Sequence, residues 1–337
     1  MTIKIGIAGF GKIGQVRAYE LEKNENSKVV AVFDVNKIDK LDNNIKIVES
    51  FAELLNQDID AVFICAFNNV LADFTCLALK AGKHVFCEKP PARTTKELKS
   101  VIEIENNSNL ILKYGFNHRY HYSVQEAKKL IDSGSMGKLL WLRGVYGKAG
   151  SIDYHKNWRN YSKYSGGGIL IDQGIHMLDL MRYFSRQNFT HINSFVTTSY
   201  WDIKSEDNAF AIMQSDDKVT AMLHSSATQW KHKFLLEMCF EEGYINLDGI
   251  LSGTRSYAPE KLVVGRREFE DITHAMGKPK ENTTWFENDD SWKFEVDEFI
   301  DAILGKTKIK HGTSKDAYET LRLVERIYEN SGFYSDK

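Results

Sequence analysis

Short apolar runs alternate with amphipathic stretches over the first third of the chain. The spacing predicts buried strands over residues 3–8, 28–34, 61–65, 84–87 and 110–114, with helices over 70–81 and 94–106 between the later ones. Strands separated by helical segments indicate right-handed crossovers and a parallel sheet. Ligands of such sheets bind beyond the carboxyl ends of the strands. We therefore search for functional side chains where these runs end.

Beyond about residue 118 the pattern changes. It predicts helices over 122–133, 169–184, 290–304 and 314–329, and extended segments over 139–146, 191–200, 208–214, 219–229, 233–240 and 244–248. The run 219–224 alternates in part between apolar and polar residues, as in a strand with one solvent-facing side. Short turns between these segments favour a mostly antiparallel sheet, with helices on one face and the other face free for a partner.

Length and composition add limits to this picture. A chain of 337 residues is long enough for two domains, which we place at 1–118 and 119–337 within an α/β fold. The hydrophobic share of 42% suffices for ordinary cores. The net charge is −2, without a long run of one sign, so we expect no nucleic-acid partner.

The chain lacks the sequence features of secretion, membrane insertion and metal binding. It has no basic segment followed by a cleavable apolar stretch, and no apolar run near the ~20 residues that span a bilayer. Its four cysteines have no CxxC spacing, which favours reduced core residues. We expect a cytoplasmic protein without a membrane partner. Neither His118 nor His121 has a recognisable third ligand nearby, so we expect no metal.

A dinucleotide-binding signature follows the first strand. The G-x-G-x-x-G pattern consists of Gly9, Phe10, Gly11, Lys12, Ile13 and Gly14. Its first glycine allows a tight turn, the second lets the backbone approach a pyrophosphate, and the third lets helix and strand pack closely. The phosphates would meet the N–H groups at the start of the helix.

The second predicted strand ends in an acidic residue. Asp34 lies twenty residues after Gly14, the spacing of a carboxylate that accepts hydrogen bonds from the adenosine ribose. Its charge would repel a 2′-phosphate, which favours NAD as the cofactor over NADP. Lys37 and Lys40 keep NADP as the less favoured alternative. A turn-capping role is the other interpretation of Asp34.

Further cofactor candidates stand at the carboxyl ends of later strands. They are Ala66, Phe67 and Asn68 after one strand, and Glu88 and Lys89 after the next. Asn117 stands in the corresponding place after the strand at 110–114.

Several motifs resemble those of the glucose–fructose oxidoreductase / inositol dehydrogenase / MocA family, over essentially the whole chain. They are the glycine pattern, residues 81–90 ending in Glu88-Lys89-Pro90, residues 115–120, the triplet Gly166-Gly167-Gly168 followed by Asp172, His176 and Asp179, and residues 299–303. The chain departs from the family at 66–68, where many members carry Thr-Pro-Asn. The resemblance implies an NAD(P)-dependent oxidoreductase of sugars, inositols or nucleotide-linked sugars. It also implies a Rossmann domain, and a second domain whose open sheet often forms the interface of a homodimer or homotetramer.

Three side chains are candidates for the chemistry. An imidazole suits a general base near neutral pH, so His176 would remove the hydroxyl proton of an alcohol. Lys89 would stabilise the developing alkoxide, or polarise a carbonyl in the reverse direction. Asp172, four residues before His176 on the expected helix, would position the substrate or orient the imidazole. Taken singly, the three also fit a loop lysine, a core histidine and a helix-terminal acid.

Other candidates would line the substrate site together with Lys89, Asp172 and His176. They are Asn117, Arg119, Tyr120, Tyr154, Trp158 and Arg159. The planar fork of Arg159 would suit a phosphate or carboxylate, which would favour an activated sugar. A surface arginine beside a packed tryptophan is an equally good interpretation.

The sequence therefore predicts an NAD-dependent dehydrogenase or ketoreductase of a small polyhydroxylated molecule. Two alternatives stay open. One is a catalytically idle protein that binds a dinucleotide or sugar and regulates a partner, because a fold can lose its chemistry. The other is a reductase of a different unsaturated group, such as an imine, on the same scaffold.

Overall fold

The computed structural model describes residues 2–38, 41 and 44–333, and these form two compact units. The first unit runs to Asn117 and adds Lys163–Gly166 and Asp290–Arg322 from later in the chain. The second comprises His118–Ser162, Gly167–Asp289 and the residues from Leu323 onward. The assignment of 1–118 and 119–337 to separate domains stays a prediction. Lys40, which kept NADP open, lies outside the described residues.

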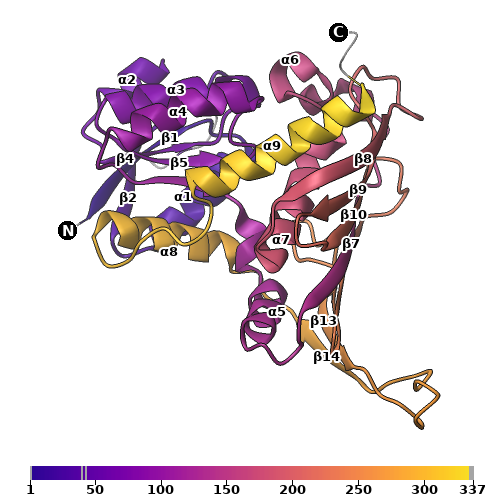
Figure 1. Ribbon diagram of the computed structural model, residues 1–337. Coiled ribbons are helices and arrows are strands. Elements are labelled where there is room, and N and C mark those ends of the chain that lie inside the picture. The colour runs from indigo at the N-terminus through magenta and orange to yellow at the C-terminus, as the bar shows by residue number, and fades with distance from the viewer. Residues whose placement is uncertain (1, 39–40, 42–43, 334–337) are drawn as a thin grey trace. The chain divides into compact units, whose positions relative to one another are not determined.

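The first unit is built on a parallel sheet of six strands (Figure 1). The strands are β1 (Ile3–Ala8), β2 (Ser27–Phe33), β3 (Lys46–Val48), β4 (Ala61–Ile64), β5 (His84–Glu88) and β6 (Leu112–Gly115). Their spatial order is β3-β2-β1-β4-β5-β6, and every neighbouring pair is parallel. This is the order of a doubly wound dinucleotide-binding sheet, so the predicted α/β class is confirmed.

Helices cover both faces of this sheet (Figure 1). On one face lie α2 (Phe51–Leu55), α3 (Asn68–Lys80) and α4 (Thr95–Asn106), and on the other α1 (Lys12–Lys23) and α8 (Ser291–Ile303). The start of α4 is fixed by the hydroxyl of Thr94, which accepts a hydrogen bond from the N–H of Glu97.

The helix α8 completes the first unit although it comes late in the chain. Its Phe299 ring lies 5.4 Å from that of Phe63 and 5.7 Å from that of Phe86, edge to face in both cases. Val296 and Ile300 join the same buried cluster. The sequence pattern placed this helix in the second part of the chain. Its apolar side, however, packs on the sheet beside α1, and no local signal reveals that.

A buried ionic cluster ties α8 to α1 and to the end of β5. The guanidinium of Arg17 is fully buried, with Nε 2.7 Å from Glu88 and Nη2 2.6 Å from Glu295. It also packs over the rings of Phe86 and Trp292. Gly115 makes room, because a Cβ there would lie 2.9 Å from a carboxylate oxygen of Glu88. A buried charge of this kind needs its partners, so the three elements are held together.

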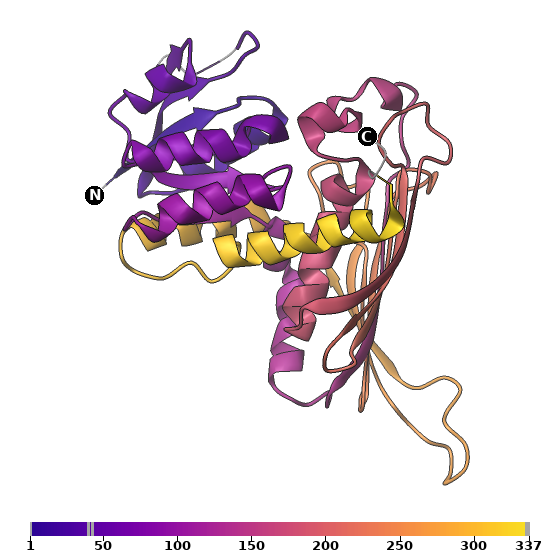
Figure 2. The same cartoon turned by 45° about the horizontal axis from the view of Figure 1, so that its top comes forward.

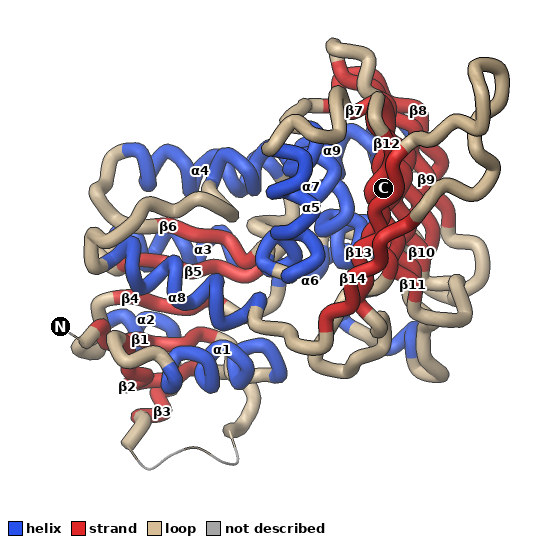
Figure 3. The backbone as a smooth tube through the Cα atoms, turned by 90° about the horizontal axis from the view of Figure 1, so that it is seen from below, coloured by secondary structure: helices blue, strands red, loops and turns tan. Residues whose placement is uncertain are grey.

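The second unit contains a sheet of eight strands (Figures 2 and 3). They are β7 (Leu139–Gly147), β8 (Phe189–Thr197), β9 (Asn208–Ser215), β10 (Thr220–Ser226), β11 (Lys233–Phe240), β12 (Gly243–Asp248), β13 (Glu260–Arg266) and β14 (Glu281–Phe286). Their order is β14-β13-β12-β11-β7-β10-β9-β8, and only β7 and β10 pair in parallel. The prediction of a mostly antiparallel sheet is confirmed, whereas β13 and β14 were not predicted.

Helices cover one face of the eight-stranded sheet. The helix α5 (Tyr122–Asp132) packs on β12, β13 and β14, and α7 (Ile175–Ser185) packs on β7 and β10. The opposite face presents exposed apolar side chains, among them Phe195, Phe210 and Ile212. The last helix, α9 (Ser314–Ser331), contributes residues to both units. Within the described residues, no helix is long and apolar enough to cross a bilayer.

The buried carboxyl group of Glu295 makes stability depend on pH. Burial raises its pKa from 4.5 to about 7, although Arg17 opposes the shift. The folded protein therefore holds a proton that the unfolded chain releases, so stability falls as the pH rises from about 4.5 through 7. Glu295→Gln removes this dependence. When the pH is raised from 5 to 8, we therefore expect the free energy of unfolding of wild type to fall by about 2 kcal/mol relative to that of Glu295→Gln. Urea unfolding at the two pH values measures this, and an equal difference at both would contradict it.

Candidate functional site

The glycine pattern folds into an open cradle at the start of α1. Gly9 has a φ of +90°, and a Cβ there would lie 2.4 Å from the carbonyl oxygen of Cys65. A Cβ at Gly14 would lie 2.1 Å from the carbonyl oxygen of Gly9, whereas one at Gly11 would meet nothing within 4 Å. The outer glycines thus allow close packing. The middle one leaves its backbone accessible to a pyrophosphate.

The carboxylate after β2 is held against this cradle. Asp34 accepts a hydrogen bond of 2.6 Å from the N–H of Phe10, and one of 2.8 Å from the N–H of Asn36. The side-chain amide of Asn36 also donates to Asp34 over 3.2 Å. A carboxylate has about four acceptor positions, so Asp34 retains room for about one ribose hydroxyl. At the start of α1, Gly11 is the N-cap and supplies no capping side chain, while Lys12 is exposed and Ile13 half-buried. These residues fit a dinucleotide.

Residues after β4 anchor a segment from later in the chain. The amide of Asn68, the first residue of α3, donates to the carbonyl of Ser165 over 2.9 Å. Arg93 donates to the carbonyl of Lys163 over 2.8 Å. Ala66 is half-buried and Phe67 is exposed at the N-terminus of α3. The proposed cofactor contacts of these residues stay a prediction.

Lys89 follows the anchored end of β5. Its side chain is half-buried, and its peptide bond to Pro90 is cis. The preceding residue, Glu88, belongs to the Arg17 cluster, which fixes the backbone next to Lys89. Asn117 is buried, and its amide lies 3.2 Å from the hydroxyl of Ser291.

In the second unit, a buried carboxylate organises the glycine triplet. Glu206 is fully buried and accepts hydrogen bonds from the N–H groups of Gly168 and Leu170, each 2.9 Å long, and from the hydroxyl of Tyr328. A Cβ on Gly168 would lie 2.2 Å from the carbonyl oxygen of Glu206. Sequence reasoning missed Glu206, because nothing near it in the chain points to a partner almost forty positions away.

The segment that carries Asp172 differs from the expectation. Residues Leu170–Gly174 form a π-helical turn, and the α-helix α7 begins only at Ile175. The predicted helix over 169–184 is present, but its first turn is π-helical instead of α-helical, and the shared face expected for Asp172 and His176 stays a prediction. Wider turns of this kind are frequent at functional sites. The hydrogen bonds of Gly168 and Leu170 to Glu206 constrain the backbone here.

Asp172 is a buried carboxylate between two cations. Its Oδ1 lies 3.2 Å from Nε of Arg159, and its Oδ2 lies 4.0 Å from Nζ of Lys148. Arg159 also packs over the ring of Trp158, 4.4 Å from its centroid. The sequence singled out Arg159 and Trp158 but not Lys148, which stands in the loop after β7.

Three tyrosines of this unit are held neutral. Burial raises the pKa values of Tyr146, Tyr154 and Tyr257 above the usual range, and the charge of Asp172 adds to the effect. Neutral phenols can both donate and accept hydrogen bonds. Such groups suit the recognition of a molecule that carries several hydroxyls.

His176, near the start of α7, packs against a second histidine. Its buried ring is stacked on that of His118, with centroids 3.9 Å apart and planes 14° apart. Nε2 of His118 lies 3.0 Å from the hydroxyl of Tyr146. The sequence offered no signal for this pairing, since His118 precedes a helix and His176 comes 58 positions later.

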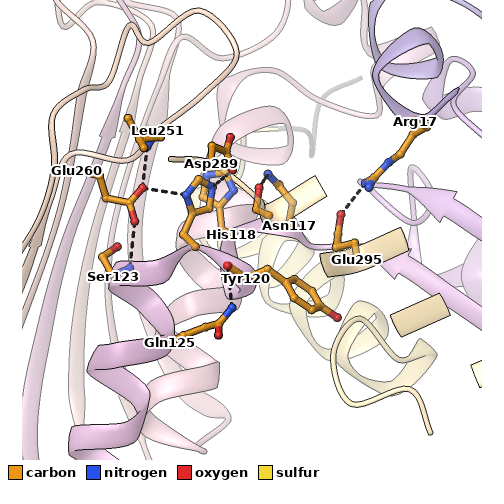
Figure 4. A network of polar contacts seen from close by, with 12 residues as sticks. Arg17, Asn117, His118, Tyr120, Ser123, Gln125, Leu251, Glu260, Asp289 and Glu295 are labelled. Atoms are coloured by element: carbon orange, nitrogen blue, oxygen red, sulfur yellow. Dashed lines mark hydrogen bonds and ion pairs between the residues drawn. The ribbon is translucent and has the colours of Figure 1, made fainter. Parts of the chain in front are cut away.

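Arg119 and Tyr120, expected at the substrate, lie buried in the 3₁₀ helix Asn117–Tyr120. Nη2 and Nε of Arg119 lie 2.6 and 2.8 Å from the two carboxylate oxygens of Asp179. The carbonyl of Tyr120 accepts from the amide of Gln125 (Figure 4). Their substrate contacts stay a prediction, and the guanidinium of Arg119 is committed to Asp179.

A second buried carboxylate holds the loop after this helix (Figure 4). Glu260 accepts hydrogen bonds from Nδ1 of His121 at 2.9 Å and from the N–H groups of Ser123 and Leu251 at 3.1 and 3.0 Å. Burial would raise the pKa of Glu260, but these donors outweigh it and hold the pKa below its usual value. His121 thus has a structural partner. Among the described residues, no group of three or more histidine, cysteine or acidic side chains could hold a metal ion.

Comparison with known proteins agrees with the motifs. Residues 3–116 match the model of an oxidoreductase family with an NAD-binding Rossmann fold, and residues 124–246 match that of the GFO/IDH/MocA C-terminal domain. The chain is 27% identical over 292 residues to an inositol 2-dehydrogenase of Salmonella paratyphi B, covering 80% of this chain and 82% of that protein.

Solved structures share the fold along the whole chain. A levoglucosan dehydrogenase in complex with NADH and levoglucosan has a TM-score of 0.84 at 18% identity, and each chain is covered to 98%. The WlbA dehydrogenase of Bordetella pertussis, in complex with NADH and UDP-GlcNAcA, has a TM-score of 0.80 at 16% identity, covering 98% of this chain and 97% of the other. At these identities the likeness establishes the fold alone.

Proposed function

This chain belongs to the Gfo/Idh/MocA family of NAD-binding oxidoreductases, and we propose that it transfers hydride between NAD(H) and a hydroxyl-bearing carbon of a sugar, inositol or nucleotide-activated sugar. The observation that carries the proposal is the buried cluster of the second unit. There Asp172, His176 and neutral tyrosines supply the acid–base and hydroxyl-binding groups that a polyol requires. The relatives named as inositol and levoglucosan dehydrogenases support the substrate class.

The proposed chemistry divides the work between two side chains. The bound nicotinamide supplies the hydride acceptor when an alcohol is oxidised. His176 accepts the proton of the substrate hydroxyl on a ring nitrogen, and Lys89 stabilises the negative charge that develops on the same oxygen. In the reduction of a ketone, Lys89 polarises the carbonyl and protonated His176 returns the proton to the oxygen. Asp172 orients the substrate by accepting a hydrogen bond from a neighbouring hydroxyl.

The two cations beside Asp172 favour a substrate that carries an anionic group. Arg159 is partly exposed while its Nε lies 3.2 Å from Asp172, so its outer nitrogens remain available to an anionic group. Lys148 adds a second cation. We propose that this side of the site accepts a carboxylate or phosphate when the sugar carries one.

We further propose NAD as the preferred cofactor. The Asp34 carboxylate is fixed beside the cradle by the N–H of Phe10, and a negative charge there disfavours a 2′-phosphate. Localisation in the cytoplasm stays a prediction.

The exposed face of the eight-stranded sheet supports assembly into a homodimer or homotetramer, which we propose here. Apolar side chains form cross-strand rows on it: Phe195 stands opposite Phe210, and Ile212 stands opposite Met222. Contiguous exposed apolar surface of this kind marks an interaction site.

Kinetic measurements test the roles proposed for Lys89 and His176. We expect Lys89→Ala and His176→Ala each to lower kcat by about 10²- to 10⁴-fold, because each removes a group that acts on the reacting oxygen. NADH absorbance with a panel of inositols, aldoses and nucleotide sugars provides the measurement. A matched control is Lys83→Ala, since Lys83 stands at the opposite end of β5 and binds the carbonyl of Ile59.

Full activity in either variant would remove that residue from the mechanism. No turnover of any sugar, despite tight dinucleotide binding, would favour the regulatory alternative. Turnover of an imine in place of the panel would favour the third interpretation.

The cofactor proposal is tested at Asp34. We expect Asp34→Ala to weaken NAD binding and to raise the relative use of NADP, because it removes the ribose acceptor and the charge that repels a 2′-phosphate. The ratio of kcat/KM for the two cofactors measures the preference. Asp60→Ala is the matched control, since Asp60 likewise accepts a backbone N–H, from Lys4 at 2.7 Å, before β4 begins. An unchanged ratio in Asp34→Ala would disprove the assignment.

The assembly proposal is tested by a charge on the sheet. We expect the double variant Ile212→Lys, Met222→Lys to form a smaller particle than wild type, because burying two lysine charges against an apolar partner is unfavourable. Light scattering after size exclusion measures the mass. Leu77→Lys, at an exposed position on α3, should leave the mass unchanged. A monomeric wild type, or an unaffected double variant, would contradict the proposal.

A further inference from the structure

We propose that His118 is a positioning residue for His176: its stacked ring fixes the imidazole of His176 and makes a second proton on the pair unfavourable. This inference rests on the function proposed above, which gives His176 the proton of the substrate.

The two rings form a nearly parallel stack inside the second unit. Their centroids are 3.9 Å apart and their planes 14° apart, and both side chains are buried. The hydroxyl of Tyr146 lies 3.0 Å from Nε2 of His118. Because burial keeps Tyr146 protonated, its phenol is a constant hydrogen-bonding partner. The orientation of His118 is thereby set from the side of β7.

An ion pair next to the stack holds the same two elements together. Arg119, adjacent to His118, makes a two-point contact with Asp179, three residues after His176 on α7. Both partners are buried, and a planar guanidinium bound at two points resists rotation. The backbone that carries each ring is therefore fixed. A change of His176 to another rotamer would break the stack.

Charge limits what the pair can hold. Two protonated imidazoles face to face in a buried place would repel each other strongly, whereas one imidazolium on a neutral ring is favourable. The surrounding carboxylates already have cationic or donor partners: Asp179 has Arg119, Asp172 has Arg159, and Glu260 has His121, whose ring lies 5.5 Å from that of His118. Tyr146, 6.4 Å from the ring of His176, and Tyr257 beside it are neutral.

The consequence for the reaction is a defined proton position. When His176 takes the hydroxyl proton of the substrate, the neutral ring of His118 faces the new imidazolium. His118 contributes by holding that ring, and no proton has to pass through it. An aromatic ring without nitrogen atoms can still stack on His176, so it should largely preserve the function of His118.

Three variants separate positioning from proton relay. We expect His118→Ala to lower kcat about tenfold or more with little change in KM for NAD, while His118→Phe retains most of kcat because it preserves the stack. Tyr146→Phe, which removes only the phenolic hydroxyl and keeps the stack, should likewise retain most of kcat. If His118→Phe loses as much kcat as His118→Ala, His118 relays the proton and the positioning role is wrong. Full kcat in His118→Ala also overturns the proposal.

The proton count is measured without turnover. In histidine ring NMR titrations of the complete protein, we expect His176 and His118 to titrate as a coupled pair in two separated steps. In His118→Phe, His176 should titrate in one step. The matched control is His224→Phe, which also replaces a stacked imidazole by a phenyl ring. His224 is stacked on Phe210, with centroids 4.0 Å apart, on the uncovered face of the sheet, so this variant should leave the titration of His118 and His176 unchanged.

The two readouts keep the proposals apart. Coupled titration in a protein that turns over no substrate would show the pairing of the two rings but remove the proposed function, and with it the positioning role of His118 in the reaction. Independent, single-step titration of both rings in wild type overturns the inference, even in an active enzyme.

Discussion

The first unit depends on one buried guanidinium. Arg17 stands on α1 and binds Glu88 at the end of β5 and Glu295 on α8. Its side chain is fully buried, so water does not screen its charge. Removing Arg17 would leave the buried carboxyl groups of Glu88 and Glu295 without their cation, and an unpaired charge in an apolar interior is strongly unfavourable. The lysine that we assign to catalysis follows directly after Glu88. The backbone next to this lysine is thus fixed by the salt bridge between Arg17 and Glu88.

The second unit uses buried carboxylates in the same way. Glu206 takes up the N–H groups of the glycine triplet, and Asp179 fixes the segment that carries His118. Glu260 holds the loop that follows. Each carboxylate satisfies several donors that would otherwise be buried without partners, and that need strongly selects one local conformation. Asp172 and His176, the residues that we propose for the site, extend from a backbone that is constrained on both sides.

A polyol site requires groups that tolerate many hydroxyl orientations. Neutral tyrosines meet this need because a phenol can donate or accept, and burial keeps Tyr146, Tyr154 and Tyr257 protonated. The charged groups of Asp172, Arg159 and Lys148 would fix the orientation of a bound substrate. In the mechanism that we propose, His176 accepts the proton and the stacked ring of His118 holds it in place. These features agree with an enzyme of sugars or inositols better than with a passive binding protein, which needs no proton acceptor.

The sequence alone determined the features that local spacing encodes. The alternation of strands and helices predicted the parallel sheet, and the glycines with Asp34 predicted the cradle, because close approach of backbone atoms admits only glycine at fixed offsets. Local spacing did not reveal that α8 completes the first unit, that Leu170–Gly174 forms a π-helical turn, or that β13 and β14 extend the sheet. The partners of Arg17, Glu206 and His118 were equally hidden. All of these features depend on contacts between residues that are distant in the chain. Local preference permits several conformations there, and burial and the pairing of charges select one of them.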